Sequence, residues 1–405
     1  MAFDRLASAT LDPIMIRQPR NLWIAGWVSL LTDLSSHMIF PLLPFYLTRV
    51  LGAGPAIVGL IEGAAETVAA MLKLYAGRWS DRIGRRKPFV VGGYALSALS
   101  KILFIPALTW MLILGARVIE RIGKGIRSAP RDALIAEEAQ AHEVGRAFGV
   151  QRAMDGAGGM LGAIIAWYLI SRMEYREIFL WSLIPAFLAV LVALALRETG
   201  SSVALVKAVT APAPRKQAPP LPPQVRAAVV SCALYALGHL SFVFLLLAGS
   251  AGGWSDQRTL MAYVLYLAVY TLISPLAGHA SDRIGRRRML VLGYCVFGAM
   301  AFLLPLLIGS PWLLLVFLGY GLAEAITDAV QRAWIADLAP RDQKAAAMGA
   351  YHAAIALVAL PGGFAIGSLW GSFGVSAACA ASLTLTSIAA VALMRIPHTA
   401  VPSAA

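Results

Sequence analysis

The stretch Gly77-Arg-Trp-Ser-Asp-Arg-Ile-Gly-Arg-Arg86 occurs a second time as Gly278-His-Ala-Ser-Asp-Arg-Ile-Gly-Arg-Arg287. A further set of matches follows each copy. Ala133, Ile135, Ala136 and Gly149 recur as Ala333, Ile335, Ala336 and Gly349. Duplication explains these matches better than chance does, so the sequence predicts two related halves.

The composition between and around these copies is that of a membrane protein. Of 405 residues, 59% are hydrophobic and 14% are charged, whereas soluble domains have about a quarter of their residues charged. The apolar residues fall into runs close to the roughly 20 residues that cross a bilayer as a helix. We therefore expect an all-α membrane protein with twelve transmembrane helices in two pseudo-symmetric six-helix bundles. The expected spans are 21–48, 55–78, 89–107, 110–127, 147–171, 177–196, 227–249, 258–279, 289–308, 311–335, 347–370 and 373–394.

Between the halves, the segment 197–226 contains the run Ala-Pro-Pro-Leu-Pro-Pro at 218–223. A proline-rich, basic segment of this kind is typical of an extended and solvated linker. We expect an N-terminal bundle over 1–196, a cytoplasmic linker over 197–226 and a C-terminal bundle with a short tail over 227–405.

The charges indicate the orientation. Lys and Arg concentrate in the loops 78–88, 127–146, 197–226 and 283–288, which predicts that these loops and both termini are cytoplasmic. Residues 1–20 carry charges and no apolar stretch, so we expect no signal peptide. The net charge of +13 lies between the spans, which argues against a nucleic-acid partner.

The duplicated stretch resembles the Gly-x-x-x-Asp-Arg-x-Gly-Arg-Arg signature of the major facilitator superfamily, in full at both places. The stretch from Arg121 to Asp132, which reads Arg-Ile-Gly-Lys-Gly-Ile-Arg-Ser-Ala-Pro-Arg-Asp, is similar to a bacterial branch of that superfamily. The resemblance implies a multi-pass transporter of the bacterial cytoplasmic (inner) membrane. It also implies a small-molecule substrate of unknown class within the lipid bilayer, and we expect a monomer.

In the resembling family this loop stabilises one transport state from the cytoplasmic side. The residue types fit such a role, because Gly77 and Gly278 permit close helix approach, while Gly84 and Gly285 suit a turn with positive φ. The alternative is that the arginines are only topogenic charges. The residues that we expect at the cytoplasmic gate are Gly77, Asp81, Arg82, Gly84, Arg85, Arg127, Arg131, Arg152, Asp155, Gly278, Asp282, Arg283, Gly285, Arg286, Asp328 and Arg332.

Charges inside the spans are the second pointer to function. An ionisable group at the centre of a spanning helix costs roughly 2.5 to 3.5 kcal/mol, so such groups tend to face the bundle interior or a wet cavity. Helix positions suggest that the charges of spans four and ten can meet across the halves. The residues that we expect at a substrate or proton cavity are Asp33, Glu62, Glu66, Arg117, Glu120, His239 and Glu324.

Arg117 occupies the place of an arginine that proton-coupled antiporters of the superfamily use, although this chain has Arg121 where that pattern expects glycine. By hypothesis, Asp33 or Glu66 carries the proton and Arg117 tunes it. Fixed interhelical pairs without a transport role are the alternative. We expect no cofactor, with a proton gradient as the energy source.

The direction of transport rests on a partial resemblance. Gly149, Gly158 and Gly162 keep the spacing of the superfamily's antiporter signature, while Ala163 and Ala166 replace its final Pro and Gly. Tight helix packing explains these small residues equally well. We favour proton-coupled efflux over proton-driven uptake, and a receptor or lipid scramblase on the same scaffold stays open.

An enzyme is not expected, because the chain has no metalloprotease His-Glu-x-x-His, no Gly-x-Ser-x-Gly and no complete phosphate loop. Cys232, Cys295 and Cys379 lie singly in different spans, so we expect packing roles for them and no metal site.

Overall fold

The computed structural model describes residues 20–138, 144–198, 220–340 and 343–396, and every element in these ranges is a helix. The first half contains α2 (Arg20–Ile39), η1 (Phe40–Leu42), α3 (Leu43–Phe45), η2 (Tyr46–Val50), α4 (Pro55–Ile83), α5 (Lys87–Ile102), α6 (Trp110–Glu138), α7 (Val144–Leu169) and α8 (Tyr175–Leu194). The second half contains α10 (Pro223–Leu237), α11 (Phe242–Ala251), α12 (Asp256–Ile284), α13 (Arg286–Leu307), α14 (Leu313–Leu338), α15 (Lys344–Phe373) and α16 (Val375–Met394). The twelve predicted spans and the all-helical class are confirmed.

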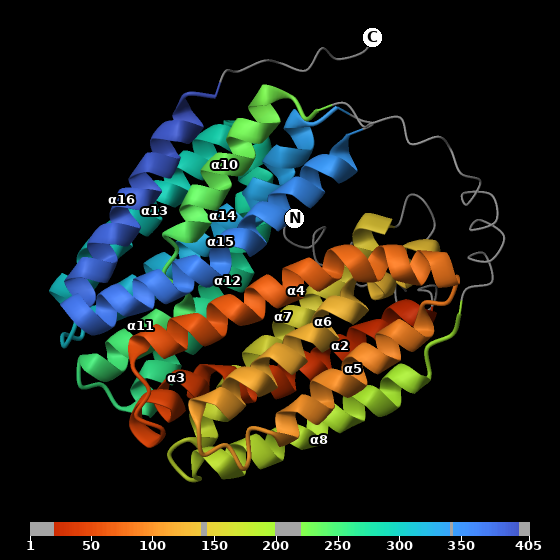
Figure 1. Ribbon diagram of the computed structural model, residues 1–405, viewed down its shortest axis with the longest axis horizontal. Coiled ribbons are helices and arrows are strands. Elements are labelled where there is room, and N and C mark those ends of the chain that lie inside the picture. Colours follow the sequence, from red (N-terminus) through yellow and green to blue (C-terminus); the bar gives the residue numbers. More distant parts are fainter. Residues whose placement is uncertain (1–19, 139–143, 199–219, 341–342, 397–405) are drawn as a thin grey trace, which may run out of the picture.

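The helices pack as two groups (Figure 1). In the first, α2 packs on α7 and α8, and α6 packs on α4 and α5. In the second, α14 packs on α12 and α13, while α10 and α13 both contact α16. Contacts between the groups are made mainly by α4 with α15 and by α7 with α12. The linker predicted over 197–226 falls mostly outside the described residues, so these domain limits stay a prediction.

The first and seventh spans are broken helices, which the sequence reading missed. In the first, Pro41 and Pro44 lack the backbone N–H of a continuous helix, and α2 gives way to η1, α3 and η2. In the seventh, α10 ends at Leu237 and α11 starts at Phe242, next to the cap residue Ser241. The two breaks lie at equivalent places in the two halves, since α2 ends at Ile39 and the gap between α10 and α11 contains His239, 200 positions later.

The two ends of the bundle differ in charge, and we name them by this difference. The basic face is the end that carries the turns at Gly84 and Gly285, where arginines cluster. The opposite face is the end that carries Arg49 and Asp256. Backbone geometry at the basic face agrees with the sequence, since Gly84 has φ +70° and Gly285 has φ +99°.

Several helices extend past the predicted spans at the basic face. We expected α6 to end at 127 and α4 at 78, but α6 runs to Glu138 and α4 to Ile83. The predicted lengths were wrong because they were cut to the thickness of a bilayer, whereas a helix can continue into water beyond it. The loops predicted at 78–88 and 127–146 are therefore largely helical within the described residues.

Within the described residues, nine segments are long and apolar enough to cross a membrane by length and composition. The remaining spans are α5, α6 and α7. α5 has only 16 residues, and α6 carries several charges in its middle. These spans are tolerated because their polar groups face other helices or the cavity between the halves.

Candidate functional site

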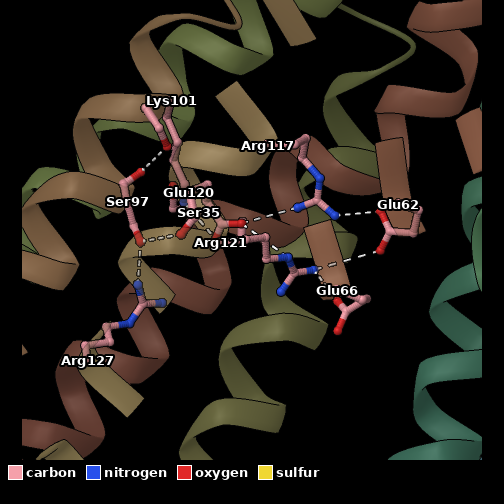
Figure 2. Close-up of polar contacts among 11 residues, drawn as sticks. Ser35, Glu62, Glu66, Ser97, Lys101, Arg117, Glu120, Arg121 and Arg127 are labelled. Carbon is pink, nitrogen blue, oxygen red and sulfur yellow. Dashed lines mark hydrogen bonds and ion pairs between the residues drawn. The ribbon is translucent and has the colours of Figure 1, made fainter. Parts of the chain in front are cut away.

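Arg117 is the centre of a polar network between α6 and α4. Its side chain is 1% exposed, and its Nη2 donates to Glu62 Oε2 over 2.6 Å. Nη1 lies 3.4 Å from Glu120 Oε2, one turn along α6. The guanidinium also lies 3.8 Å from the ring centroid of Phe40, which the break in the first span places there. A buried charge is thus held by two carboxylates (Figure 2) and by an aromatic face.

Arg121 extends this network by one turn of α6. Its Nη2 lies 2.9 Å from Glu66 and 3.9 Å from Glu62, and its Nε lies 3.5 Å from Glu120. The i, i+4 spacing of Glu62 and Glu66 on α4 therefore matches that of Arg117 and Arg121 on α6. The pairing predicted across the halves is wrong for these arginines, since their carboxylate partners all belong to the first half.

The second half has a smaller polar group. His239 Nε2 lies 3.1 Å from Glu324 Oε1, and the hydroxyl of Tyr266 donates to the other oxygen of Glu324. The His239 ring stacks on Phe297 with 5.1 Å between centroids. His239 lies in the break between α10 and α11, so the interruption of the seventh span brings it to this place.

A cavity of 680 Å³ lies between the halves. It is wide enough for a small organic solute, since ligand pockets commonly measure about 300 to 1,000 Å³. Residues from the middle of the spans and from their ends at the basic face line it. Among the predicted site residues, the cavity wall includes Glu62, Glu66, Arg152, His239, Glu324, Asp328 and Arg332. Arg117 lies behind that wall.

Asp33 lines a second, smaller space of 80 Å³ together with Glu120, Arg121, Lys124 and Arg127. Unlike Glu62 and Glu66, Asp33 makes no ion pair within the part of the chain that the structure describes. The sequence prediction placed Asp33 in one cavity with Glu66, whereas the structure separates the two across the Arg121 side chain.

At the opposite face, ionic contacts join the two halves. Arg49 Nη1 lies 2.6 Å from Asp256 Oδ1, and its Nη2 donates to Ser250 over 2.8 Å. The hydroxyl of Tyr175 also donates to Asp256. Deeper along the same contact, a Cβ atom on Gly59 would lie 2.0 Å from the carbonyl oxygen of Gly363, so α4 and α15 approach backbone to backbone.

At the basic face, the predicted gate residues pair within their own halves. Arg286 contacts Asp282 at 2.6 Å and Asp337 at 3.0 Å, while Arg86 contacts Glu137 at 2.5 Å. The sequence reading missed Arg86, Glu137 and Asp337. The recurrence that follows the duplicated stretch could have found them, because Glu137 and Asp337 sit at equivalent places. The side chain of Asp81 lies outside the described part.

The glycines and arginines of the two copies of the duplicated stretch differ in their surroundings. Gly77 faces the Cβ of Ala129, but the close approach predicted at Gly278 is wrong, because a Cβ there would meet nothing within 4 Å. The turns that follow the two glycines also differ, since α13 begins directly after Gly285 whereas α5 begins at Lys87, three residues after Gly84. The exposed arginines of the gate set are Arg82, Arg85, Arg152 and Arg283, of which Arg152 lines the cavity.

The remaining members of the gate set lie deeper. Arg127 is buried, donates to Ser97 and lies 4.3 Å from the Tyr94 ring centroid. Arg131 pairs with Asp132 at 2.8 Å, and Arg332 pairs with Asp328 at 2.5 Å. Each of these three contacts lies within one half. Gln151 donates to Asp155 over 2.9 Å.

A buried lysine was also missed. Lys101 on α5 is 1% exposed, and its Nζ donates to Ser35 over 2.6 Å and to Ser36 over 3.1 Å (Figure 2). The sequence signal was present, since Lys101 is the one charged residue in the apolar run from Phe89 to Ala116. Of the three α7 glycines that keep the antiporter spacing, two fit tight packing. A Cβ on Gly158 or Gly162 would collide with the backbone of α2, whereas one on Gly149 would meet nothing within 4 Å.

The three cysteines lie apart from one another, in α10, α13 and α16. Cys232 and Cys379 are buried as expected for packing, whereas Cys295 is exposed. In the described ranges, no three His, Cys, Asp or Glu side chains are grouped so as to hold a metal ion. What the site offers chemically is a polar cavity with charged walls, beside a network of arginines and carboxylates.

Comparisons with known proteins agree with this architecture. The family model of the Major Facilitator Superfamily matches residues 25–260 and 227–404. An MFS-type transporter of Methanocaldococcus jannaschii is 32% identical over 359 residues, which cover 87% of this chain and 88% of the relative. Multidrug resistance protein MdtH of Photorhabdus laumondii is 33% identical over 160 residues, which cover 38% of this chain and 39% of MdtH.

Solved structures share the fold at low identity. The nucleoside transporter NupG aligns with a TM-score of 0.77 and 12% identity, over 94% of this chain and all of that chain. An inward-open form of the xylose transporter XylE from E. coli aligns with a TM-score of 0.73 and 16% identity, over 94% and 97% of the two chains. With the family model matching both halves, the chain belongs to the Major Facilitator Superfamily and is a multi-pass membrane transporter, not an enzyme.

Proposed function

We propose that this transporter exports a small solute across a bacterial cytoplasmic membrane in exchange for protons, by alternating access. The observation that carries the proposal is the network of Arg117, Arg121 and their three carboxylates beside a cavity between the two halves. Charges at this depth of a membrane protein are costly and serve ion or proton pathways in many transporters.

The proposed orientation has the basic face in the cytoplasm. The arginine-rich turns at Gly84 and Gly285 both lie on that face, and positively charged loops stay on the cytoplasmic side. Both termini then lie in the cytoplasm as well, because the number of spans is even.

In this orientation the described state is inward-open. Arg49, Asp256 and Tyr175 link the halves at the opposite face, and the Gly59 and Gly363 backbones touch. The cavity lies on the other side of these contacts and reaches residues close to the basic face, such as Lys73 and Arg332. Rocking of the two halves about the site would break the first set of contacts and close the cavity mouth.

Asp33 and Glu66 are the proposed proton carriers. The Glu66 side chain is 53% exposed to the cavity and is held by Arg121, which takes the tuning role that we had expected of Arg117. Asp33 lines the small space beside Arg121 and Lys124 without an ion pair there among the described residues. Asp33 can therefore bind and release a proton as its surroundings change, and Glu66 can do so when its contact with Arg121 opens.

Efflux is supported by the partial similarity to MdtH, a protein named for multidrug resistance. The similarity covers 38% of this chain and 39% of MdtH, so it bears on the direction of transport and not on the identity of the solute. Proton-driven uptake is the competing direction, and it predicts that solute and protons move the same way.

The test uses the purified full chain in liposomes that contain a pH-sensitive dye. Compounds that raise the thermal unfolding midpoint of the protein are added outside, and proton movement is recorded. Antiport predicts that inward movement of the compound drives protons out of the liposomes. The variant Asp33→Asn or Glu66→Gln is expected to abolish this proton signal. The control variant Glu177→Gln is expected to keep it. Glu177 belongs to the capping box of α8 at the opposite face, away from the cavity. Protons that follow the compound inward would establish symport, and unchanged signals in both variants would remove the carrier assignment.

A further inference from the structure

The cations of the cavity wall differ from its carboxylates in how they are paired. Each cavity carboxylate has a basic partner: Glu62 with Arg117, Glu66 with Arg121, Glu324 with His239 and Asp328 with Arg332. Lys73, Lys124 and Arg152 also line the cavity and are exposed to it. None of the three has a carboxylate within the 4.0 Å of an ion pair in the described parts of the chain.

Two of these cations gather at the end of the cavity near the basic face. Lys73 comes from α4 and Arg152 from α7, and both line the cavity together with Arg332. Arg332 belongs to α14 of the other half. The three cations therefore come from both sides of the interface that has to close when the transporter changes state.

The nearby carboxylates do not neutralise this cluster. Asp132 is held by Arg131 and Asp328 by Arg332, so each of these pairs contributes no net charge. Asp155 lies one turn from Arg152 on α7 and accepts a hydrogen bond from Gln151. Glu66 is the next acid on α4, two turns from Lys73, and is held by Arg121. Lys73 and Arg152 thus keep a local surplus of positive charge that faces water.

Unpaired, water-facing cations in a cavity of this size are a binding site for a negatively charged group. Lys and Arg bind carboxylate and phosphate oxygens through charge-assisted hydrogen bonds, and these are stronger than bonds between neutral groups. The rest of a solute would face Tyr235, Tyr270 and Tyr351, which also line the cavity. Their hydroxyl groups and rings suit an uncharged or aromatic part.

We propose that the transported solute carries an oxyanion, a carboxylate or a phosphate, which binds Lys73 and Arg152 of the first half together with Arg332 of the second. The anion bonds to cations of both halves at once, so its binding favours closure of the basic face. This inference rests on the proposed function, in that the cavity is the transport pathway.

The test measures thermal unfolding of the intact protein in detergent at constant ionic strength, with matched probes. Benzoate is compared with benzamide and benzylamine, and glycerol 3-phosphate with glycerol. A ligand that binds the folded state raises the unfolding midpoint in a saturable manner. We expect this with benzoate or glycerol 3-phosphate and not with the neutral or cationic compounds. Stabilisation by benzoate indicates a carboxylate site, and stabilisation by glycerol 3-phosphate indicates a phosphate site.

Three variants make the assignment specific. Lys73→Met with Arg152→Gln is expected to weaken anion binding about tenfold or more. Asp328→Asn releases Arg332 and is expected to strengthen binding, which keeps the proposal testable if the double variant fails to fold. Arg226→Gln removes one positive charge from the exposed surface of α10 and is expected to leave binding unchanged.

The proposal is overturned if neutral or cationic probes stabilise the protein as well as the anions do, or if no oxyanion acts up to about 10 mM. It is also overturned if the anion effect survives in the double variant. Because no pH gradient is present, a positive result stands even if proton coupling is absent. Conversely, proton-coupled flux of an uncharged compound in liposomes would contradict the inference of an anionic solute and would still support the proposed function.

Discussion

Arg117 on α6 donates to Glu62 on α4 over 2.6 Å, and this contact ties together two helices of the same half. Glu62 lines the cavity and Arg117 lies behind it, almost completely buried. The position of the cavity wall therefore depends on an ion pair whose basic member cannot reach water. Its strength can be measured against the neighbouring pair of Arg121 and Glu66, which differs mainly in exposure.

Glu62→Gln is expected to lower the stability of the protein by about 3 kcal/mol, because it leaves the charge of Arg117 buried with only the longer contact to Glu120. Glu66→Gln is the matched control. It is expected to cost less than about 1 kcal/mol, since Glu66 is half exposed and Arg121 keeps Glu120 at 3.5 Å. Thermal unfolding in detergent compares the two. Equal losses would show that burial of Arg117 does not decide the strength of this pair.

Gly59→Leu is expected to force α4 and α15 apart near the opposite face, because even a Cβ atom would collide with the Gly363 carbonyl. The inward-open state should then lose population. The readout is the reaction of Ala236→Cys, a position in the cavity wall, with an impermeant maleimide in a Cys295→Ser background.

In Gly59→Leu, labelling of Ala236→Cys by reagent at the basic face should become slower. Labelling by reagent at the opposite face should become faster. Gly115→Leu is the control, since a Cβ at Gly115 would meet nothing within 4 Å. If both variants behave like the parent, the contact of Gly59 with Gly363 does not limit opening at that face.

Asp256→Asn is expected to weaken closure of the opposite face, because Arg49 and Tyr175 both bind the Asp256 carboxylate. The pair is partly exposed, so we expect about 1 kcal/mol, or a change of about fivefold in the ratio of the two states. Reaction of Ala236→Cys from the opposite face measures this ratio. The charge exchange Arg49→Asp with Asp256→Arg should restore part of the closure, and a lack of any restoration would contradict an ionic cause.

The number of membrane spans could be predicted from the sequence, because arginine-rich loops separate the long apolar runs and each run corresponds to one crossing. The sequence was insufficient for the breaks in the first and seventh spans. Pro41 and Pro44 sit in an apolar run, and His239 looks like a lone polar residue in another, so neither interrupts hydropathy. Both breaks are decided by what the chain packs against.

Pairing could be predicted only in part. The spacing of Glu62 with Glu66 and of Arg117 with Arg121 was visible in the sequence, but the partner helices were not. Nothing local indicates that α6 faces α4 and not α14, because that choice depends on how the halves pack. For the same reason, the sequence did not distinguish the paired carboxylates of the cavity from the unpaired Lys73 and Arg152.

The most direct test of the account is labelling of Glu66→Cys and Ala236→Cys, one from each half, with an impermeant maleimide in inside-out and right-side-out vesicles. We predict that both react from the basic face, exposed in inside-out vesicles, while Leu272→Cys on the apolar outer surface of α12 reacts from neither side. A cavity that is closed at the opposite face predicts slow reaction in right-side-out vesicles. Two unreactive cavity positions, or reaction only from the opposite face, would contradict a cavity between the halves that opens at the basic face.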